Sequence, residues 1–288
     1  MIRSMTAFAA HEANAGRFAL GWELRSVNHR YLDISIRLPE QFRSLEPEIR
    51  TLIGNRLKRG KVECSLFCRV LDGEEPGIRI NHSLVRNVLA AAGEIETIMP
   101  ARSAFSALDI LRWPGVQLDA DINWSPLKVQ VLKSLEAALI ILSGVREREG
   151  AQLAAMIRER CRGMREQVKR ARESMPDILR TVRTKLEKRI TELVKEPDYD
   201  RFEQEIVYLM QKMDVDEELD RLGTHIDEVE SVIDQNGAVG RRLDFLMQEM
   251  NREANTLGSK SADTRTTRVS VELKVLIEQM REQVQNIE

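Results

Sequence analysis

From about Ser125 to the end of the chain, apolar residues recur every three or four positions, which matches the turn of an α-helix. Ser125 can cap the first such segment, and Pro126 fits its first turn. We expect this helix to end near Ser174 and further helices to follow Pro176 and Pro197. The last segment, from about Arg268, has a heptad-like stripe: Val269, Leu273, Leu276, Met280, Val284 and Ile287. Such stripes predict long helical hairpins, or a helical subunit interface.

The first third of the chain has a different pattern. Residues 16–27, 30–39 and 61–71 alternate between polar and apolar side chains, as strands do. A helix is expected between them, with Ser44 as its cap and Gly60 at its end. The segment DGEEPG (72–77) predicts a turn before a short strand, IRIN. Antiparallel strands with interspersed helices indicate an α+β fold. We expect a mixed strand and helix domain over 1–120 and a domain of long helical hairpins over 121–288.

Composition excludes several classes of protein. Charged residues make up 31% of the 288 residues, yet the net charge is only −2, so bulk charge does not favour nucleic acid. Cys64, Cys68 and Cys161 have no zinc-site spacing, and we expect free thiols in a reducing compartment. We expect neither a secretory signal nor a membrane-spanning segment, since the sequence shows no apolar run of the length that either would need. A soluble, cytoplasmic protein is therefore expected.

The most unusual stretch is GRRLDFLMQEMNREANTLGSKS, residues 240–261, which predicts a helix with three stripes. Its apolar stripe consists of Leu243, Leu246, Met247, Met250, Ala254 and Leu257. A second stripe combines amides, an acid and arginines: Asp244, Gln248, Asn251 and Asn255, with Arg241 and Arg252 adjoining. A row of amides suggests a hydrogen-bonding role. It could bind a sugar-phosphate backbone or pair with another helix across an interface.

The third stripe of this helix carries Glu249 and Glu253, with Arg242 beside them. Two carboxylates one turn apart could ligate a hard divalent ion, which prefers oxygen ligands. Alternatively, they are ordinary surface charges balanced by arginine.

The preceding helix, over about 214–233, places Glu218 and His225 on one edge of its apolar face. A neutral imidazole near carboxylates can bind a metal or act as a general base. His225 could equally be a satisfied core residue. A connection of seven residues, DQNGAVG, allows the two helices to pack as an antiparallel pair.

Basic residues are concentrated in two segments, 43–61 and 146–191, and the second has 14 Lys and Arg against 7 Asp and Glu. A local excess of this kind suits phosphate, although a solvated helix face gives the same signal. The segment RSVNHRYLD adds Arg25, Asn28, His29 and Arg30 next to Tyr31 around a turn. Cations, an amide and an aromatic suit single-stranded RNA. A polar hairpin end is the alternative.

Several segments together resemble the bacterial YicC/YloC family. They are RSM near the start, RSVNHRYLD, RLPEQFRSLEP, RGKVEC, the 240–261 block and the closing ELKVLIEQMREQVQNIE. The resemblance implies a metal-dependent endoribonuclease that cleaves single-stranded RNA and favours Mn²⁺ or Mg²⁺. It also implies a homo-oligomer, a ring- or clamshell-like hexamer, with a role in RNA turnover and with RNA-degradation proteins among its possible partners.

The resemblance, combined with the stripes, gives each candidate residue an expected role. Glu249 and Glu253, with Glu218 or His225, would hold the divalent ion. Catalysis would rest on His225, Glu249, Glu253 and Arg252. RNA would be bound by Arg25, Asn28, His29, Arg30, Arg59, Lys61, Arg241, Arg242, Gln248, Asn251, Asn255 and Lys260.

Two chemical routes remain open at this point. In one, a metal activates water or polarises a phosphoryl oxygen. In the other, His225 or His29 takes the 2′-hydroxyl proton of the ribose, and the product ends in a 2′,3′-cyclic phosphate. A different class of function also remains: a non-catalytic RNA-binding adaptor that recruits another nuclease.

Overall fold

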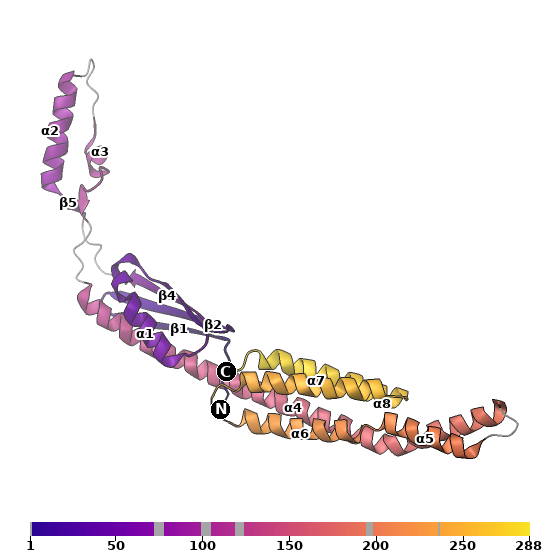
Figure 1. The fold of residues 1–288 in the computed structure, drawn as a ribbon. Helices are drawn as coiled ribbons and strands as arrows, with labels where there is room; N and C mark the ends of the chain where they lie inside the picture. Colours follow the sequence, from indigo (N-terminus) through magenta and orange to yellow (C-terminus); the bar gives the residue numbers. More distant parts are fainter. Residues whose placement is uncertain (1, 72–77, 99–104, 119–123, 194–197, 236) are drawn as a thin grey trace.

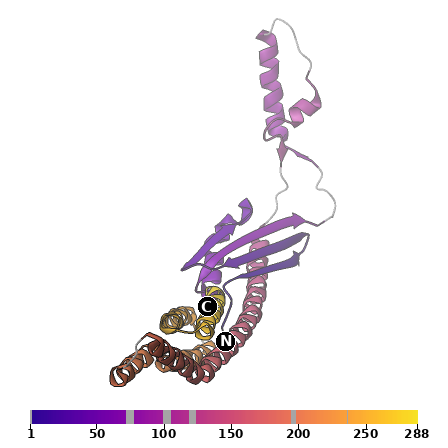
Figure 2. The ribbon, with the colours of Figure 1, turned by 90° about the vertical axis from the view of Figure 1, so that its right-hand side faces the viewer.

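The computed structural model describes residues 2–71, 78–98, 105–118, 124–193, 198–235 and 237–288. A sheet unit and a helical bundle lie along one long helix, α4 (Ser125–Leu193), and the molecule is elongated and curved (Figures 1 and 2). At 1.5 Å per residue, the 69 residues of α4 extend roughly 100 Å. Its first half packs on the sheet and its second half packs in the bundle. The predicted α+β class is confirmed.

The sheet has four strands in the order β1-β2-β4-β3. They are β1 (Ala7–Ala15), β2 (Phe18–Val27), β3 (Leu32–Arg37) and β4 (Gly60–Val70). Neighbours β1, β2 and β4 are antiparallel, as expected, but β3 runs parallel to β4. The expectation of antiparallel strands is wrong for this pair because the helix between β3 and β4 returns the chain to the same end of the sheet.

The helix between β3 and β4 is α1 (Glu46–Arg56), which follows a 3₁₀ turn, Glu40–Leu45. Ser44 is not its cap: it lies inside the 3₁₀ turn, and its hydroxyl accepts a hydrogen bond from Lys128 Nζ at 2.9 Å. Nor does Gly60 end the helix. It opens β4 with a φ of 108°, a conformation that glycine adopts without strain.

One face of the sheet is buried against α1 and the first half of α4. Trp22 of β2 is fully buried, and its indole N–H donates to the Val131 carbonyl at 3.2 Å and to Ser134 Oγ at 3.0 Å on α4. Trp22 therefore attaches the sheet to the long helix.

Helix α4 passes through Pro176 without ending. The expected end near Ser174 and the new helix after Pro176 are therefore wrong, because packing on both sides of the proline stabilises the helical path. Ala171 and Ile178 are buried, and Leu179, Val182 and Leu186 face Ile206 and Met210 of α5 (Tyr199–Met213). Helix α5 does follow Pro197, as expected, and Asp198 caps it by accepting from Arg201 N at 3.1 Å.

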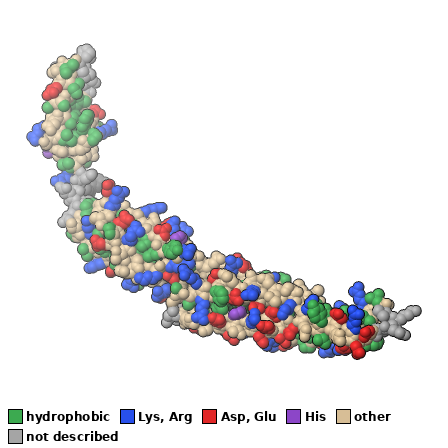
Figure 3. All heavy atoms as spheres, viewed as in Figure 1, with side chains coloured by type: hydrophobic (Ala, Val, Ile, Leu, Met, Phe, Trp, Pro, Cys, Tyr) green, Lys and Arg blue, Asp and Glu red, His purple; other side chains and the backbone are tan. Residues whose placement is uncertain are grey.

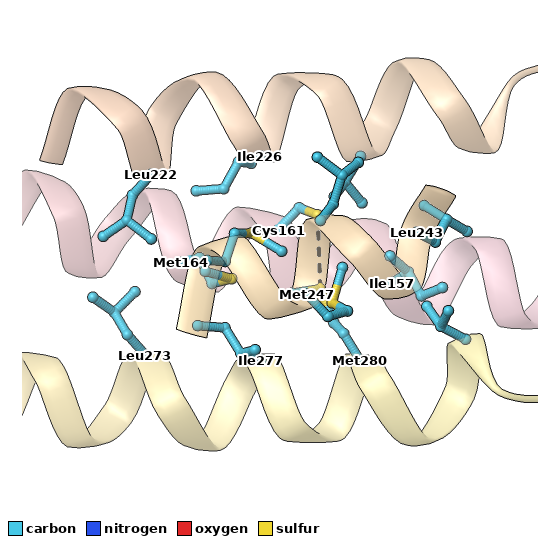
Figure 4. Close-up of a cluster of buried hydrophobic side chains, with 14 of the residues drawn as sticks. Ile157, Cys161, Met164, Leu222, Ile226, Leu243, Met247, Leu273, Ile277 and Met280 are labelled. Atoms are coloured by element: carbon cyan, nitrogen blue, oxygen red, sulfur yellow. Dashed lines mark hydrogen bonds between the residues drawn. The ribbon is translucent and has the colours of Figure 1, made fainter. Parts of the chain in front are cut away.

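The bundle consists of the second half of α4 with α6 (Asp216–Ile233), α7 (Gly240–Lys260) and α8 (Thr264–Val284). The apolar stripe expected for 240–261 is entirely buried, and Figure 4 shows Leu243 and Met247 in the shared core with Ile157, Cys161 and Ile277. The heptad-like stripe of α8 is also buried or packed against the core. The helix begins at Thr264, four residues before the expected start at Arg268.

A small arm projects from the sheet unit (Figure 1). It contains β5 (Arg79–Ile80), α2 (His82–Ile98), α3 (Ala107–Leu111) and β6 (Gln117–Leu118). The expected turn at 72–77 and the expected domain boundary at 120 fall outside the described residues. In the described ranges, no helix has both the length and the apolar character needed to cross a membrane.

Candidate functional site

Helices α6 and α7 pack side by side in opposite directions, and ion pairs join them along one seam. Lys260 Nζ lies 2.8 Å from Glu218 Oε1, and Arg221 Nη1 lies 3.3 Å from Glu253 Oε1. Arg242 donates to Glu228 at 2.8 Å nearer the loop between the helices. The antiparallel pair expected from the short DQNGAVG connection is confirmed.

Two carboxylates of this seam are buried: Glu218 is 7% exposed and Glu253 is 4% exposed. A buried charge requires a partner, and each of these carboxylates has a basic residue beside it. The hydrogen bond from Arg221 to Glu253 raises the pKa of the arginine above its usual value. Oε2 of Glu218 has no hydrogen-bond partner among the described residues.

His225 lies on α6 between Arg221 and Glu228, whose partners on α7 are Glu253 and Arg242. The segment of α7 opposite His225 therefore includes Glu249, which shares the stripe of Glu253. The imidazole is partly buried, and its Nδ1 is enclosed without a partner in the described part of the chain. The seam thus collects Glu218, His225, Glu249 and Glu253 along a line.

These four residues do not form a metal site within one chain. No three His, Cys, Asp or Glu side chains of the described ranges are grouped closely enough to hold an ion. Lys260 and Arg221 already neutralise the two buried carboxylates. A divalent ion bound here would have to displace those cations.

The row of amides lies on a different side of α7. Gln248 and Asn255 are exposed there with Arg241 and Arg252, while Asp244 and Asn251 are partly buried. Gln248 Nε2 donates to Asp244 Oδ2 at 2.9 Å. This surface belongs neither to the bundle core nor to the α6 seam, so it is open to a partner.

Phe245 lies on the same open face and is 57% exposed. Phe245 was not among the residues predicted to bind RNA, because a phenylalanine in an amphipathic helix is usually assigned to the core. Its position on the side of the helix opposite the apolar stripe, seven residues before Arg252, was the available signal. An exposed aromatic among arginines and amides is a combination that binds unpaired bases.

Two residues expected to bind RNA have other partners in the structure. Lys260 donates to Glu218 and to the Asp214 carbonyl, and Arg242 pairs with Glu228. No described residue forms an ion pair or a hydrogen bond with the side chains of the other four, which are Arg241, Arg252, Asn251 and Asn255.

The segment around Asn28–Tyr31 forms an exposed turn between β2 and β3. His29 Nδ1 lies 3.0 Å from the Tyr31 carbonyl, and Arg59 Nε donates to the His29 carbonyl at 3.0 Å. The Arg30 guanidinium lies 5.2 Å from the centre of the Tyr31 ring. Arg25 and Lys61 extend from the adjoining strands on the same side of the sheet. The structure therefore brings the expected N-terminal residues together.

The two basic segments differ in their pairing. Within 146–191, arginines of α4 bind acids of α6 and its loop: Arg158 pairs with Asp234, Arg165 with Asp227 and Glu230, and Arg172 with Asp220. The excess charge of α4 is therefore largely neutralised. Within 43–61 only Arg50 has a close carboxylate partner, Glu46. Lys61 is 4.0 Å from Glu63. Figure 3 shows basic and acidic side chains on both the sheet unit and the bundle.

The turn and the seam are separate, since one belongs to the sheet unit and the other to the bundle. His29 and His225 therefore lie on different units of the molecule and do not form a single site. A substrate that contacts both must be long enough to pass from one unit to the other, as a nucleic acid strand is.

Comparison with known proteins covers almost the whole chain. Residues 2–155 match the family model "Endoribonuclease YicC-like, N-terminal region", and residues 171–288 match "Endoribonuclease YicC-like, C-terminal". The chain is 40% identical over 288 residues to a probable endoribonuclease YicC of Haemophilus influenzae and 33% identical over 297 residues to one of Clostridioides difficile. Both alignments cover all of this chain and all of the relative. This chain is therefore a member of the YicC-like endoribonuclease family.

Proposed function

We propose that this protein is an endoribonuclease that cleaves single-stranded RNA in the cytoplasm as part of RNA turnover. The observation that carries the proposal is the full-length match to relatives named as probable endoribonucleases. The preference for unpaired RNA rests on the side chains: exposed aromatics lie among cations at both the β2–β3 turn and the open face of α7.

The RNA strand binds across both surfaces. At the turn, Arg30 and Arg59 contact phosphates and Tyr31 stacks on a base. On α7, Arg241 and Arg252 contact the backbone, while Gln248 and Asn255 donate to sugar and phosphate oxygens. Phe245 stacks on a second base.

The hydrogen-bond geometry favours His29 as the proton acceptor. Its Nδ1 lies 3.0 Å from the Tyr31 carbonyl oxygen and 3.4 Å from the Tyr31 nitrogen. The tautomer with hydrogen on Nδ1 donates in the shorter contact and leaves Nε2 as the basic nitrogen. Nε2 takes the proton of a ribose 2′-hydroxyl, the 2′-oxygen forms a bond to phosphorus, and the bond to the 5′-oxygen breaks. The products are a 2′,3′-cyclic phosphate and a 5′-hydroxyl whose proton comes from water.

Arginines near the turn stabilise the charge that develops in this reaction. Arg59 uses Nε for the His29 carbonyl, so its terminal nitrogens remain available to a phosphoryl oxygen. The alternative location of the catalytic residues is the α6–α7 seam, with His225, Glu249, Glu253 and Arg252.

Dependence on Mn²⁺ or Mg²⁺ is part of the proposal, although the seam residues of one chain do not assemble an ion site. The ion would then be ligated jointly by the protein and RNA phosphates, or by residues of two copies. No step of the cleavage described above is assigned to it.

We also propose that the chain works as a homo-oligomer, with a hexamer as the expected size and with RNA-degradation proteins as further partners. The arm supports self-association, because Leu89, Ile95, Leu108 and Trp113 are large apolar side chains with exposed surface. Light scattering after size-exclusion chromatography measures the number of subunits.

Cleavage of an end-labelled single-stranded RNA with Mn²⁺, with Mg²⁺ and with EDTA tests the function. The variants are His29→Ala, His225→Ala and Glu249→Gln/Glu253→Gln, with His82→Ala in the arm as the matched histidine control and circular dichroism as the check on folding. Loss in His29→Ala alone, with cyclic phosphate ends in the wild type, supports the turn. Loss in the seam variants alone moves the chemistry to α6 and α7. RNA that shifts in a gel without any cleavage supports the adaptor alternative.

A further inference from the structure

A cavity of about 570 Å³ lies where the sheet unit meets the bundle. Its walls come from five parts of the chain: the N-terminal segment, the end of α1, the middle of α4, the α6–α7 loop and the C-terminal segment. The lining includes Arg3, Arg56, Lys58, Arg146, Glu147 and Glu288. Its volume is in the range that accommodates small phosphorylated ligands.

The cavity has an excess of positive charge, because its two acids are already paired. Arg3 Nη2 lies 2.8 Å from Glu147 Oε1, and Arg146 Nη2 lies 2.5 Å from Glu288 Oε2. Lys58 Nζ donates only to a neutral acceptor, the Gly54 carbonyl, at 3.1 Å. No described residue forms a hydrogen bond or an ion pair with the Arg56 side chain. Among the described residues, Arg56 and Lys58 therefore have no acidic partner.

The walls of the cavity are held in place by buried contacts. Arg146 is 1% exposed, and its Nε donates to the Ser4 carbonyl at 2.5 Å. The Ser4 N–H donates to the Arg146 carbonyl at 3.0 Å, and Arg3 and Glu288 exchange backbone hydrogen bonds of 3.1 and 2.8 Å. The frame of the cavity is therefore fixed, and an anion that enters it would have to order only the side chains of Arg56 and Lys58.

The lining of the cavity is adjacent in sequence to both proposed RNA-binding surfaces. Lys58 directly precedes Arg59, which contacts the His29 turn, and Ala238 of the lining lies three residues before Arg241 of α7. A strand that contacts both surfaces would pass this junction with a phosphate nearby.

We propose that this junction cavity binds a phosphate group through Arg56 and Lys58. The source of the phosphate that fits the geometry best is the backbone of the bound RNA strand, an assignment that rests on the proposed function. A free phosphorylated ligand has the same chemistry, so the experiment separates the two sources.

The test compares wild-type protein with Arg56→Ala/Lys58→Ala and with a control, Arg189→Ala/Lys185→Ala, which removes the same charge from exposed positions on the distal part of α4. The first arm measures affinity for a labelled single-stranded RNA over a range of salt concentrations. The cavity variant should bind roughly five- to tenfold more weakly, and its salt slope should fall by about 0.7 for each lost phosphate contact. The second arm titrates pyrophosphate calorimetrically without RNA.

The outcomes are distinct. Weaker RNA binding in the cavity variant but not in the control identifies the RNA backbone as the source. Pyrophosphate binding that only the cavity variant loses, with RNA affinity unchanged, identifies a free phosphorylated ligand. If both double variants behave alike in both arms, the proposal is wrong. Wild-type protein that binds pyrophosphate in the cavity but does not bind RNA would contradict the proposed function and leave the phosphate site standing.

Discussion

The guanidinium of Arg221 on α6 lies 3.3 Å from the carboxylate of Glu253 on α7, and only the glutamate is buried. The pair therefore joins two helices at the edge of the bundle core. It gives Glu253 a structural role that is independent of any catalytic one, and stability measurements can separate the two roles.

Replacing Glu253 with Gln should lower the free energy of unfolding by about 1 kcal/mol, because a charge-assisted hydrogen bond becomes a neutral one. Urea denaturation measures the change. In a double-mutant cycle with Arg221→Ala, the two effects should be non-additive. Additive effects would mean that the pair contributes no coupling, and RNA cleavage lost without any loss of stability would place Glu253 in the chemistry.

Arg146→Met should lower the free energy of unfolding by about 3 kcal/mol, because it leaves the Glu288 carboxylate and the Ser4 carbonyl without their buried partner. The control is Arg148→Met on the same helix, an exposed position where a change within about 0.5 kcal/mol is expected. Urea unfolding of both variants is the measurement. Equal midpoints would show that Arg146 does not stabilise the junction.

The parts of the fold that sequence analysis predicted correctly are those with a strong local period. The stripes of α6, α7 and α8 are buried as expected, because the spacing of apolar residues alone determines which face of a helix avoids water. Strand β1 was missed because its inward side is mainly alanine, with Ala7, Ala9 and Ala13, so the alternation in hydrophobicity is weak. For α4, the local pattern wrongly predicted two helices divided at Pro176. Contacts with distant segments stabilise the continuous helix, and a local pattern does not include such contacts.

The residues of the candidate site divide in the same way, into those that a local pattern predicts and those that depend on contacts between distant segments. The N-terminal turn could be predicted because its residues are adjacent in sequence or in strand register. The partners of Lys260 and Arg242 could not, since they depend on how α6 and α7 align. The junction cavity could not be predicted for the same reason: its walls come from five segments that are distant in sequence, between Arg3 and Glu288.

Burial protects two of the three free thiols. It raises the pKa of Cys64 and of Cys161 to about 12 each, whereas Cys68 is only partly buried. At pH 7.5 an exposed-thiol reagent such as dithionitrobenzoate should modify Cys68 first and the other two only on unfolding. Fast modification of three thiols in the folded protein would contradict this order.

The same pKa shifts make stability depend on alkaline pH. Between about pH 9 and 12 the thiols of the unfolded chain lose protons that the folded protein retains. Because the unfolded state then binds fewer protons, the free energy of unfolding falls as the pH rises through this window. Cys64→Ala/Cys161→Ala should lose less stability between pH 8 and 10.5 than the wild type, as measured by urea midpoints at each pH.

Pro176→Ala should stabilise the distal part of α4. Proline has no N–H, so the Arg172 carbonyl one turn earlier lacks its usual donor, and alanine restores it. A gain of about 1 kcal/mol or more is expected. Hydrogen exchange should slow around residues 170–180 and stay unchanged near Leu135–Leu142. Faster exchange in the variant would show that the bundle is adapted to a bend at Pro176.

Two glycines of α4 should respond in opposite directions to the same substitution. A Cβ added at Gly150 would lie 2.2 Å from the Ile2 carbonyl oxygen, whereas one added at Gly144 would meet nothing within 4 Å. Gly144→Ala should therefore stabilise the protein by roughly 0.5–1 kcal/mol through helix propensity. Gly150→Ala gains the same propensity, but it displaces the N-terminal segment that forms the junction with Arg146 and Glu288, and a net loss of about 2 kcal/mol is expected. Urea midpoints give the sign of each change, and hydrogen exchange at Arg3–Met5 reports whether the segment has moved. Equal gains in both variants would mean that the N-terminal segment does not need its close approach to α4.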